Sequence, residues 1–265
     1  MEDSDWSYSG ENGPINWHLS FPVALSDYQS PIFLNTDDVV YDPGLQPLQF
    51  IKYNVCSVET WTLINDGCGI RLDLKSDAKV TWLNSPSTYQ VKCIYFHWGS
   101  RDNRGAEHII DGRSYPMEIQ IIHRNTKYDE ADMYTKIDGL LAISIWAELS
   151  ASDNASLENV VKNLHKVKYK GQETLMEQFS LLTLLPIDNI NYYRYSGSLT
   201  MPPCNECVTW IIFDGPIKIS SRQLEQFRQT MSSYQEDDED IPLADNFRPT
   251  QRLCRRIVYA SFKAQ

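Results

Sequence analysis

The chain has 265 residues, of which 42% are hydrophobic and 12% aromatic, and its formal net charge is −11 at a sequence pI near 4.9. This apolar content can bury a substantial core, which excludes a disordered chain, and the acidic balance argues against a nucleic-acid-binding protein, whose affinity requires clustered Lys and Arg. The sequence has no Pro-, Gly- or Ser-rich linker and no internal repeat, so we expect residues 1–265 to form a single domain.

The N-terminal segment MEDSDWSYSG is acidic and has no apolar signal core, and no apolar stretch reaches the length of a membrane span. We therefore expect a soluble, cytoplasmic protein with no membrane span; a mature secreted fragment is the alternative. The acidic run from Gln235 to Asp240 is expected to be a solvated loop, with docking to a basic partner as the alternative. The six cysteines are too sparse for a disulfide framework and are expected to be reduced thiols: Cys56, Cys68, Cys93, Cys204, Cys207 and Cys254.

Strand signals dominate the chain. Runs of β-branched and aromatic residues predict strands over 78–83, 89–98, 117–124, 140–149 and 207–213. Several of these runs are apolar on both faces, as the central strands of a covered sheet require.

Two helices are predicted, both short. The first, over 156–168, begins behind a Ser156 cap and carries apolar residues at i, i+3, i+4 and i+7: Leu157, Val160, Val161 and Leu164. The second, over 220–231, has capping-box spacing and a buried stripe: the box is Ser220 and Gln223, and the stripe is Leu224, Phe227 and Met231. The predicted fold class is mainly β (α+β), with one large sheet and short peripheral helices.

Two neighbouring strand segments carry the chemistry. Because side chains alternate in a strand, Tyr95 and His97 of YQVKCIYFHW share one face, and Glu118 and Gln120 of MEIQIIHR share one face while His123 points the opposite way. A tri-histidine zinc site can be built from an i, i+2 pair on one strand and a third ligand from its neighbour. Such a site keeps an open position for water, whose pKa the metal lowers to about 7.

Many motifs, in order along the chain, are similar to those of α-class carbonic anhydrases: WSYSGENGPINW, QSPI, FHWGS, GAEH, DGLLAISI, YYRYSGSLTMPPCNECVTWIIF and DNFRPTQ. The resemblance spans essentially the whole chain. It implies a single-domain α-carbonic anhydrase fold, built on a large, mostly antiparallel twisted sheet, with the functional site in a conical cleft.

The resemblance places the three zinc-ligand positions of active family members at Tyr95, His97 and Gln120, so two of three ligand histidines are missing. Tyr95 would have to ionise from a pKa near about 10, and Gln120 offers only a neutral amide oxygen. His123 cannot substitute, because an odd offset on a strand faces the other way. We therefore predict that zinc is absent, that His97 is a core histidine, and that the Tyr95 ring fills part of the metal space.

The supporting positions implied by the resemblance are altered as well. Cys93 stands where active members have a glutamine that holds the first histidine, and Cys68 stands at the proton-shuttle histidine, for which a thiol is a poor relay. Glu118 matches the carboxylate that orients the third histidine and is expected to accept a hydrogen bond from Gln120.

Other site positions are retained. Thr200 and Glu107 match the pair that orients zinc-bound hydroxide in active members, and we interpret them as retained structure joined by a hydrogen bond. Four further residues match positions of the cleft: Tyr8, Leu199, Val208 and Trp210.

In missing these ligand histidines, the chain resembles the carbonic anhydrase-related proteins, which lack zinc ligands and hydratase activity. YKGQ, PPC and DNFRPTQ are similar to the cytosolic type-eight group, whereas loss at both Tyr95 and Gln120 also resembles the carbonic anhydrase-like ectodomains of receptor tyrosine phosphatases. Secreted relatives commonly pair the cysteine of PPC, here Cys204, with one just before QSPI. FPVALSDYQSPI contains no cysteine, which favours a reducing compartment.

The sequence thus predicts a catalytically inactive carbonic anhydrase-related protein, a pseudoenzyme that serves as a protein-binding module. The type-eight resemblance implies an intracellular protein partner, with an inositol trisphosphate receptor calcium channel as the candidate. Two alternatives remain: an active zinc carbonate dehydratase that hydrates CO2 with unusual ligands, and an esterase-like or small-molecule-binding role for the cleft.

Overall fold

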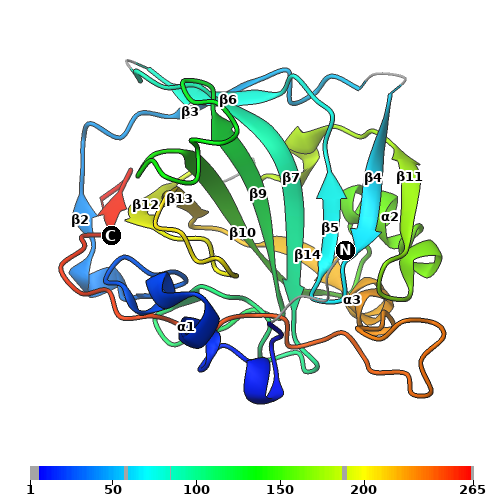
Figure 1. The fold of residues 1–265 in the computed structure, drawn as a ribbon. Coiled ribbons are helices and arrows are strands. Elements are labelled where there is room, and N and C mark those ends of the chain that lie inside the picture. Colours follow the sequence, from blue (N-terminus) through cyan, green and yellow to red (C-terminus); the bar gives the residue numbers. More distant parts are fainter. Residues whose placement is uncertain (1–5, 57–58, 84, 187–189, 264–265) are drawn as a thin grey trace.

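The computed structural model describes residues 6–56, 59–83, 85–186 and 190–263 (Figure 1). Within this part of the chain, 13 strands join in one sheet: β2 Val40–Tyr41, β3 Leu48–Ile51, β4 Thr60–Asn65, β5 Ile70–Asp73, β6 Lys79–Trp82, β7 Tyr89–Trp98, β9 Met117–Asn125, β10 Leu140–Ser150, β11 Glu173–Glu177, β12 Tyr192–Gly197, β13 Val208–Phe213, β14 Ile217–Ser220 and β15 Tyr259–Ala260. Two further short strands, β1 Phe33–Leu34 and β8 Ile109–Ile110, pair with each other.

Helices are short and peripheral. The α-helices are α1 Trp17–Ser20, α2 Ala155–Val161 and α3 Ser221–Arg228. The 3-10 helices are η1 Gly10–Asn12, η2 Pro22–Leu25, η3 Thr36–Asp38, η4 Leu164–Val167 and η5 Leu181–Leu184. No helix in the described ranges has the length and apolar character that crossing a membrane requires.

The large sheet follows the order β11-β4-β5-β7-β9-β10-β13-β12-β15-β2, with β14 beside β10 and β6 joining β3 to β7. Most pairs are antiparallel, and the parallel pairs are β10–β13, β10–β14 and β15–β2. This confirms the predicted fold class of a large, mostly antiparallel sheet with short helices at its periphery.

The centre of the sheet is buried on both faces. Ile94, Phe96 and Trp98 of β7 belong to one apolar cluster, whereas Cys93 and, partly buried, Tyr95 belong to another. The alternation of side chains along β7 therefore separates two cores, as the strand period dictates. The first cluster is covered by α2 and α3, which lie together at one side of the sheet in Figure 1.

The helix predictions needed three corrections. The helix predicted over 156–168 ends at Val161, and the 3-10 helix η4 follows it. The N-cap of α2 is Asn154, whose side chain accepts a hydrogen bond from the Ser156 backbone N–H, so the predicted Ser156 cap was wrong. The capping box of α3 is confirmed at Ser220 and Gln223. Met231 lies beyond the end of α3 and bridges Pro242 instead, because the helix ends at Arg228.

Candidate functional site

The three predicted ligand positions meet on one face of the sheet. β7 and β9 are antiparallel, and their register sets Tyr95 opposite Gln120 and His97 opposite Glu118. Directly opposite residues in such a pair have Cβ atoms about 4.5–5.5 Å apart. His123 lies on the other face, bonded to the Tyr53 hydroxyl and, at 3.1 Å, to the carbonyl of Leu141.

His97 is held by the DNFRPTQ segment. Its Nδ1 lies 2.8 Å from the carbonyl oxygen of Asn246, and a carbonyl can only accept, so Nδ1 carries the proton and donates. The Asn246 side chain fixes the same strand, accepting from the Trp98 N–H at 2.8 Å and donating to the Phe96 carbonyl at 3.0 Å. The other ring nitrogen, Nε2, is buried without a hydrogen-bond partner among the described atoms and lies 3.6 Å from Glu107 Oε2.

Gln120 bridges two buried carboxylates. Its side-chain nitrogen donates to Glu107 Oε2 at 2.8 Å and to Glu118 Oε1 at 2.9 Å. All three side chains are at most 1% exposed. The expected bond to Glu118 is therefore present, and the bond to Glu107 is an addition that the sequence did not predict. Both amide N–H groups of Gln120 are committed to these acids.

Glu118 is the most heavily bonded acid of the site. It accepts from the backbone N–H groups of Glu107 and His108, from His108 Nδ1, from Gln120 and from the Ser144 hydroxyl, at 2.7–3.0 Å. Burial raises the pKa of Glu118, but the charge of His108 and its hydrogen bonds outweigh burial and hold that pKa at about 2. Glu118 is therefore a fixed, ionised centre.

Glu107 and Thr200 are both buried but are not joined as predicted. Glu107 Oε1 accepts from the Arg248 backbone N–H at 2.9 Å, and Oε2 accepts from Gln120. Within the described part of the chain, no hydrogen bond joins Thr200 to Glu107. The predicted Thr–Glu bond was therefore wrong, because Gln120 supplies the donor to that carboxylate.

Tyr95 lines two hollows in the surface of the protein. It lines the apolar cleft described below and also a polar hollow lined by Arg71 and Asp73. Burial, and then the neighbouring Cys93, raise the pKa of Tyr95 far above its usual value, against an opposing hydrogen bond and charge from Arg71. The phenol therefore stays protonated at neutral pH.

The two altered cysteine positions lie in different places. Cys93 lines the cleft, and burial raises the pKa of its thiol to about 12. Cys68 lies between β4 and β5 and is only partly buried, with its sulfur 4.0 Å from the carbonyl oxygen of Trp6. The Cys93 thiol therefore stays protonated at neutral pH.

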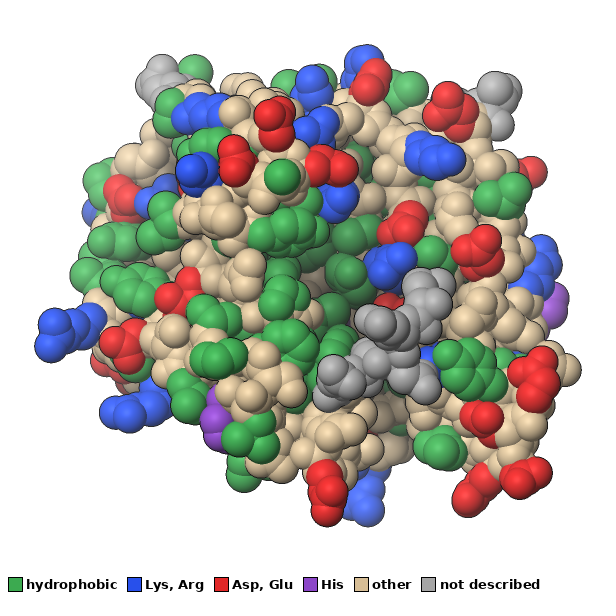
Figure 2. Space-filling model, in the orientation of Figure 1, with side chains coloured by type: hydrophobic (Ala, Val, Ile, Leu, Met, Phe, Trp, Pro, Cys, Tyr) green, Lys and Arg blue, Asp and Glu red, His purple; other side chains and the backbone are tan. Residues whose placement is uncertain are grey.

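An apolar cleft of about 380 Å³ opens beside these residues. Leu199, Val208 and Trp210 line it as predicted, together with Ile122, Leu140 and the Thr200–Pro203 segment. Figure 2 shows a hollow near the centre of this face, bordered by hydrophobic side chains. Tyr8 is not among the lining residues; its ring packs edge-on against Trp6 and Trp17.

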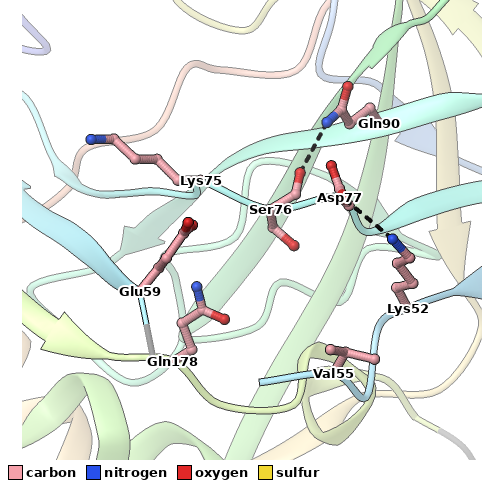
Figure 3. Close-up of a pocket in the computed structure, with 8 residues that line it drawn as sticks. All are labelled: Lys52, Val55, Glu59, Lys75, Ser76, Asp77, Gln90 and Gln178. Carbon is pink, nitrogen blue, oxygen red and sulfur yellow. Dashed lines mark hydrogen bonds and ion pairs between the residues drawn. The ribbon is translucent and has the colours of Figure 1, made fainter. Parts of the chain in front are cut away.

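A separate polar hollow of about 460 Å³ is lined by none of the predicted site residues (Figure 3). Its charges balance, because two lysines face Glu59 and Asp77, and Lys52 pairs with Asp77 at 3.2 Å. The Gln90 side chain donates to the Ser76 carbonyl across it at 3.0 Å. We find no reactive group in this hollow.

The donor set at positions 95, 97 and 120 does not fit zinc. Protein zinc sites use imidazole, thiolate and carboxylate ligands. Here the three positions provide one imidazole nitrogen on His97, a neutral amide on Gln120 whose N–H groups are already used, and a phenol on Tyr95 whose pKa is raised.

Several residues that build this site escaped the sequence analysis. Asn246 and Arg248 hold His97 and Glu107, and His108 and Ser144 hold Glu118. The motifs GAEH and DNFRPTQ contained three of these residues, so the motifs were the available signal. Their contacts join segments that are distant in the sequence, and a single sequence does not show which distant segments meet.

The chain matches the family model of eukaryotic-type carbonic anhydrases over residues 12–262. It is 38% identical to carbonic anhydrase 7 of Mus musculus over 266 residues, covering 98% of each chain. It is 35% identical to carbonic anhydrase 3 of Homo sapiens over 263 residues, covering 98% of this chain and 99% of that protein. It is also 35% identical to carbonic anhydrase 12 of Homo sapiens over 266 residues, covering 99% of this chain and 74% of that protein. The chain therefore belongs to the eukaryotic-type carbonic anhydrase family.

Proposed function

We propose that this member of the carbonic anhydrase family does not hydrate CO2 and serves instead as a cytoplasmic protein-binding module. The observation that carries the proposal is the Gln120 bridge between Glu107 and Glu118. Bound zinc would supply the Lewis acid and the activated water that hydration requires. Gln120 and Tyr95 occupy two of the positions from which that ion would be held.

The charge balance of the site supports this proposal. Two buried carboxylates are costly unless they are hydrogen-bonded or paired. Gln120 gives one N–H to each acid, and backbone and side-chain donors complete both. The two carboxylates thus find their hydrogen-bond donors within the protein, whereas His97 Nε2 has no hydrogen-bond partner among the described atoms.

The partner is part of the proposal. The resemblance to the type-eight carbonic anhydrase-related proteins suggests an intracellular protein, with an inositol trisphosphate receptor as the candidate. Cytoplasmic location is supported by the missing cysteine partner for Cys204 in FPVALSDYQSPI. Fold alone does not assign a partner, so this step rests on analogy.

The test is zinc content measured together with CO2 hydration. Protein purified without chelators should contain substoichiometric zinc by elemental analysis and should not accelerate CO2 hydration above buffer in a stopped-flow assay. Near-stoichiometric zinc together with sulfonamide-sensitive hydration would overturn the proposal and establish the active-lyase alternative.

A second candidate function is small-molecule binding in the cleft. Its volume of about 380 Å³ and its apolar walls are typical of small-ligand pockets. A panel of aromatic sulfonamides and bicarbonate, tested by thermal shift, checks this candidate, because a ligand that binds only the folded state raises Tm. An unchanged Tm across the panel would reject it.

A further inference from the structure

A basic strip runs along one edge of this acidic protein. Residues 252–263 contain four cationic side chains and no Asp or Glu: Arg252, Arg255, Arg256 and Lys263. The chain as a whole has 24 Lys and Arg against 35 Asp and Glu. The strip passes β2 and β12 on the left flank in Figure 1, and Lys and Arg side chains project from that flank in Figure 2.

A groove of about 470 Å³ lies beside this basic strip. Arg194, Arg255 and Arg256 line it together with several aromatic rings, including Tyr28 and Tyr259. Tyr28 is 40% exposed and Ile257, which also lines the groove, is 48% exposed. The groove thus offers cationic and apolar surface side by side.

Arg256 is a buried cation that forms no ion pair with a described residue. It is 7% exposed and donates to three backbone carbonyls, those of Leu253, Ser196 and Arg252, at 2.8–3.2 Å. No carboxylate in the described ranges forms an ion pair with it. A guanidinium has five N–H donors, so two remain for an additional acceptor. Burial of such a charge is costly unless an anion compensates it.

The acidic groups near the groove do not cancel this charge. Asp138, which lines the groove, already accepts from Asn125 at 3.1 Å and from the Tyr128 hydroxyl at 2.9 Å. Arg194 is paired with Asp42 at 3.8 Å. Glu206 is near Arg256 but already accepts from the Tyr28 backbone N–H at 2.7 Å and from the Gln29 side chain at 3.2 Å. Arg252 and Arg255 are exposed and form no ion pair with a described residue. The positive charge beside the groove therefore resides on the exposed Arg252 and Arg255 and on the buried Arg256.

We propose that this groove is a docking site for a short acidic peptide segment of a protein partner, one that also carries an apolar side chain. The inference rests on the protein-binding role proposed above and specifies its surface. Complementary charge would steer such a segment toward the arginines, while Ile257 and the aromatic rings would contact its apolar residue. A long polyanion such as nucleic acid is disfavoured, because it would extend past the arginines onto the acidic remainder of the protein, whose net charge is −11, whereas a short segment would not.

The experiment uses the full chain and a fluorescent peptide with the sequence of residues 234–243, YQEDDEDIPL, which combines five acids with apolar ends. The control peptide YQQNNQNIPL has the same length without the acids. Anisotropy should show binding of the acidic peptide only, and the affinity should fall when salt is raised from low to physiological concentration. The double variant Arg252→Glu/Arg255→Glu should weaken binding about tenfold or more, since two favourable charge contacts become repulsive.

A matched control variant distinguishes binding at the groove from a general effect of the protein's net charge. Arg101→Glu/Lys162→Glu reverses two exposed charges elsewhere on the molecule and should leave the affinity unchanged. The proposal is overturned if the acidic peptide does not bind at low salt, if both double variants weaken it equally, or if a single-stranded oligonucleotide binds more tightly. A concentration-dependent dimer in sedimentation that the Arg252→Glu/Arg255→Glu variant abolishes would assign the groove to a second copy. Failure of the peptide leaves the zinc and hydration test of the proposed function unaffected.

Discussion

Replacing Tyr95 and Gln120 with histidine together should create a zinc site in this protein. The register sets these two residues directly opposite each other, and His97 follows Tyr95 on the same face. The Nε2 atom of His97 has no hydrogen-bond partner among the described atoms, and its Nδ1 is already fixed by Asn246. Three imidazoles would then face one point, as an open tri-histidine site requires.

The structure also provides an orienting group for the new third ligand. Glu118 is ionised and now accepts from Gln120 at 2.9 Å, so a histidine at position 120 can donate its remaining N–H there, as carboxylate-oriented zinc ligands do. Without metal, however, the substitution removes the donor to Glu107 Oε2. Leaving a buried acceptor unpaired costs about 1–3 kcal/mol, so the metal-free variant should be less stable than the wild type.

Zinc binding should offset most or all of this loss of stability. A ligand present at one hundred times its Kd stabilises the folded state by about 2.7 kcal/mol, which corresponds to a Tm rise of about 5–10 °C in a chain of this size. Differential scanning calorimetry with and without zinc, together with equilibrium dialysis, measures both quantities. CO2 hydration should appear but remain slow if Cys93 and Cys68 occupy the supporting and proton-shuttle positions that the family resemblance implies.

The controls test the assignment of positions. The single variants Tyr95→His and Gln120→His should bind zinc much more weakly than the double variant, and adding His97→Ala to the double variant should abolish binding. A folded double variant that binds no zinc would refute the strand register and the mapping of positions 95, 97 and 120. Equal zinc binding by the wild type would refute the proposed loss of the site.

Three further predictions concern stability. Gln120→Leu removes the shared donor of two buried acids and should lower the free energy of unfolding by about 2–4 kcal/mol in urea titrations, whereas Gln229→Leu on the surface should change it little. Burial lowers the pKa of His123 to about 4, so between pH 6.5 and 4 the unfolded chain binds a proton that the folded chain does not. The free energy of unfolding should therefore fall as the pH decreases across this window. The variant His123→Gln should show a weaker pH dependence there. Phe227 packs against Phe96 and Trp98 at ring-centroid distances of 5.4 and 5.3 Å. The variant Phe227→Ala should therefore lower the free energy of unfolding by about 3–5 kcal/mol. A decrease as small as that expected for an exposed residue would contradict this packing.

The strands at the centre of the sheet could be predicted because their sequences are unambiguous. Tyr89–Trp98 was predicted with its observed bounds, and Met117–Asn125 and Leu140–Ser150 each extend one residue further than predicted. β-Branched and aromatic runs of this length have no competing helical period. The shared face of Tyr95, His97 and Gln120 could then be predicted from two things: the alternation of side chains along each strand, and the family resemblance that aligned the two strands.

What the sequence did not reveal depends on contacts between distant segments. Asn246 reaches His97 across 149 positions of the chain, and Arg248 reaches Glu107 across 141. The end of helix α3 was misjudged at Met231 because an apolar residue at helical spacing can equally well belong to the turn that follows. Tertiary contacts of this kind override local pattern.

If the metal site is lost as proposed, a glutamine at position 120 suits the rest of the site better than other side chains would. A cation held among positions 95, 97 and 120 would offset the charge of Glu118 and Glu107, and its loss leaves two buried acids beside each other. A neutral histidine has a single N–H to give, so it could satisfy only one of them. An alanine or leucine could satisfy neither, whereas the two N–H groups of a glutamine amide reach both at 2.8 and 2.9 Å. Gln120 therefore satisfies both buried acids at once, as the proposed metal-free site requires.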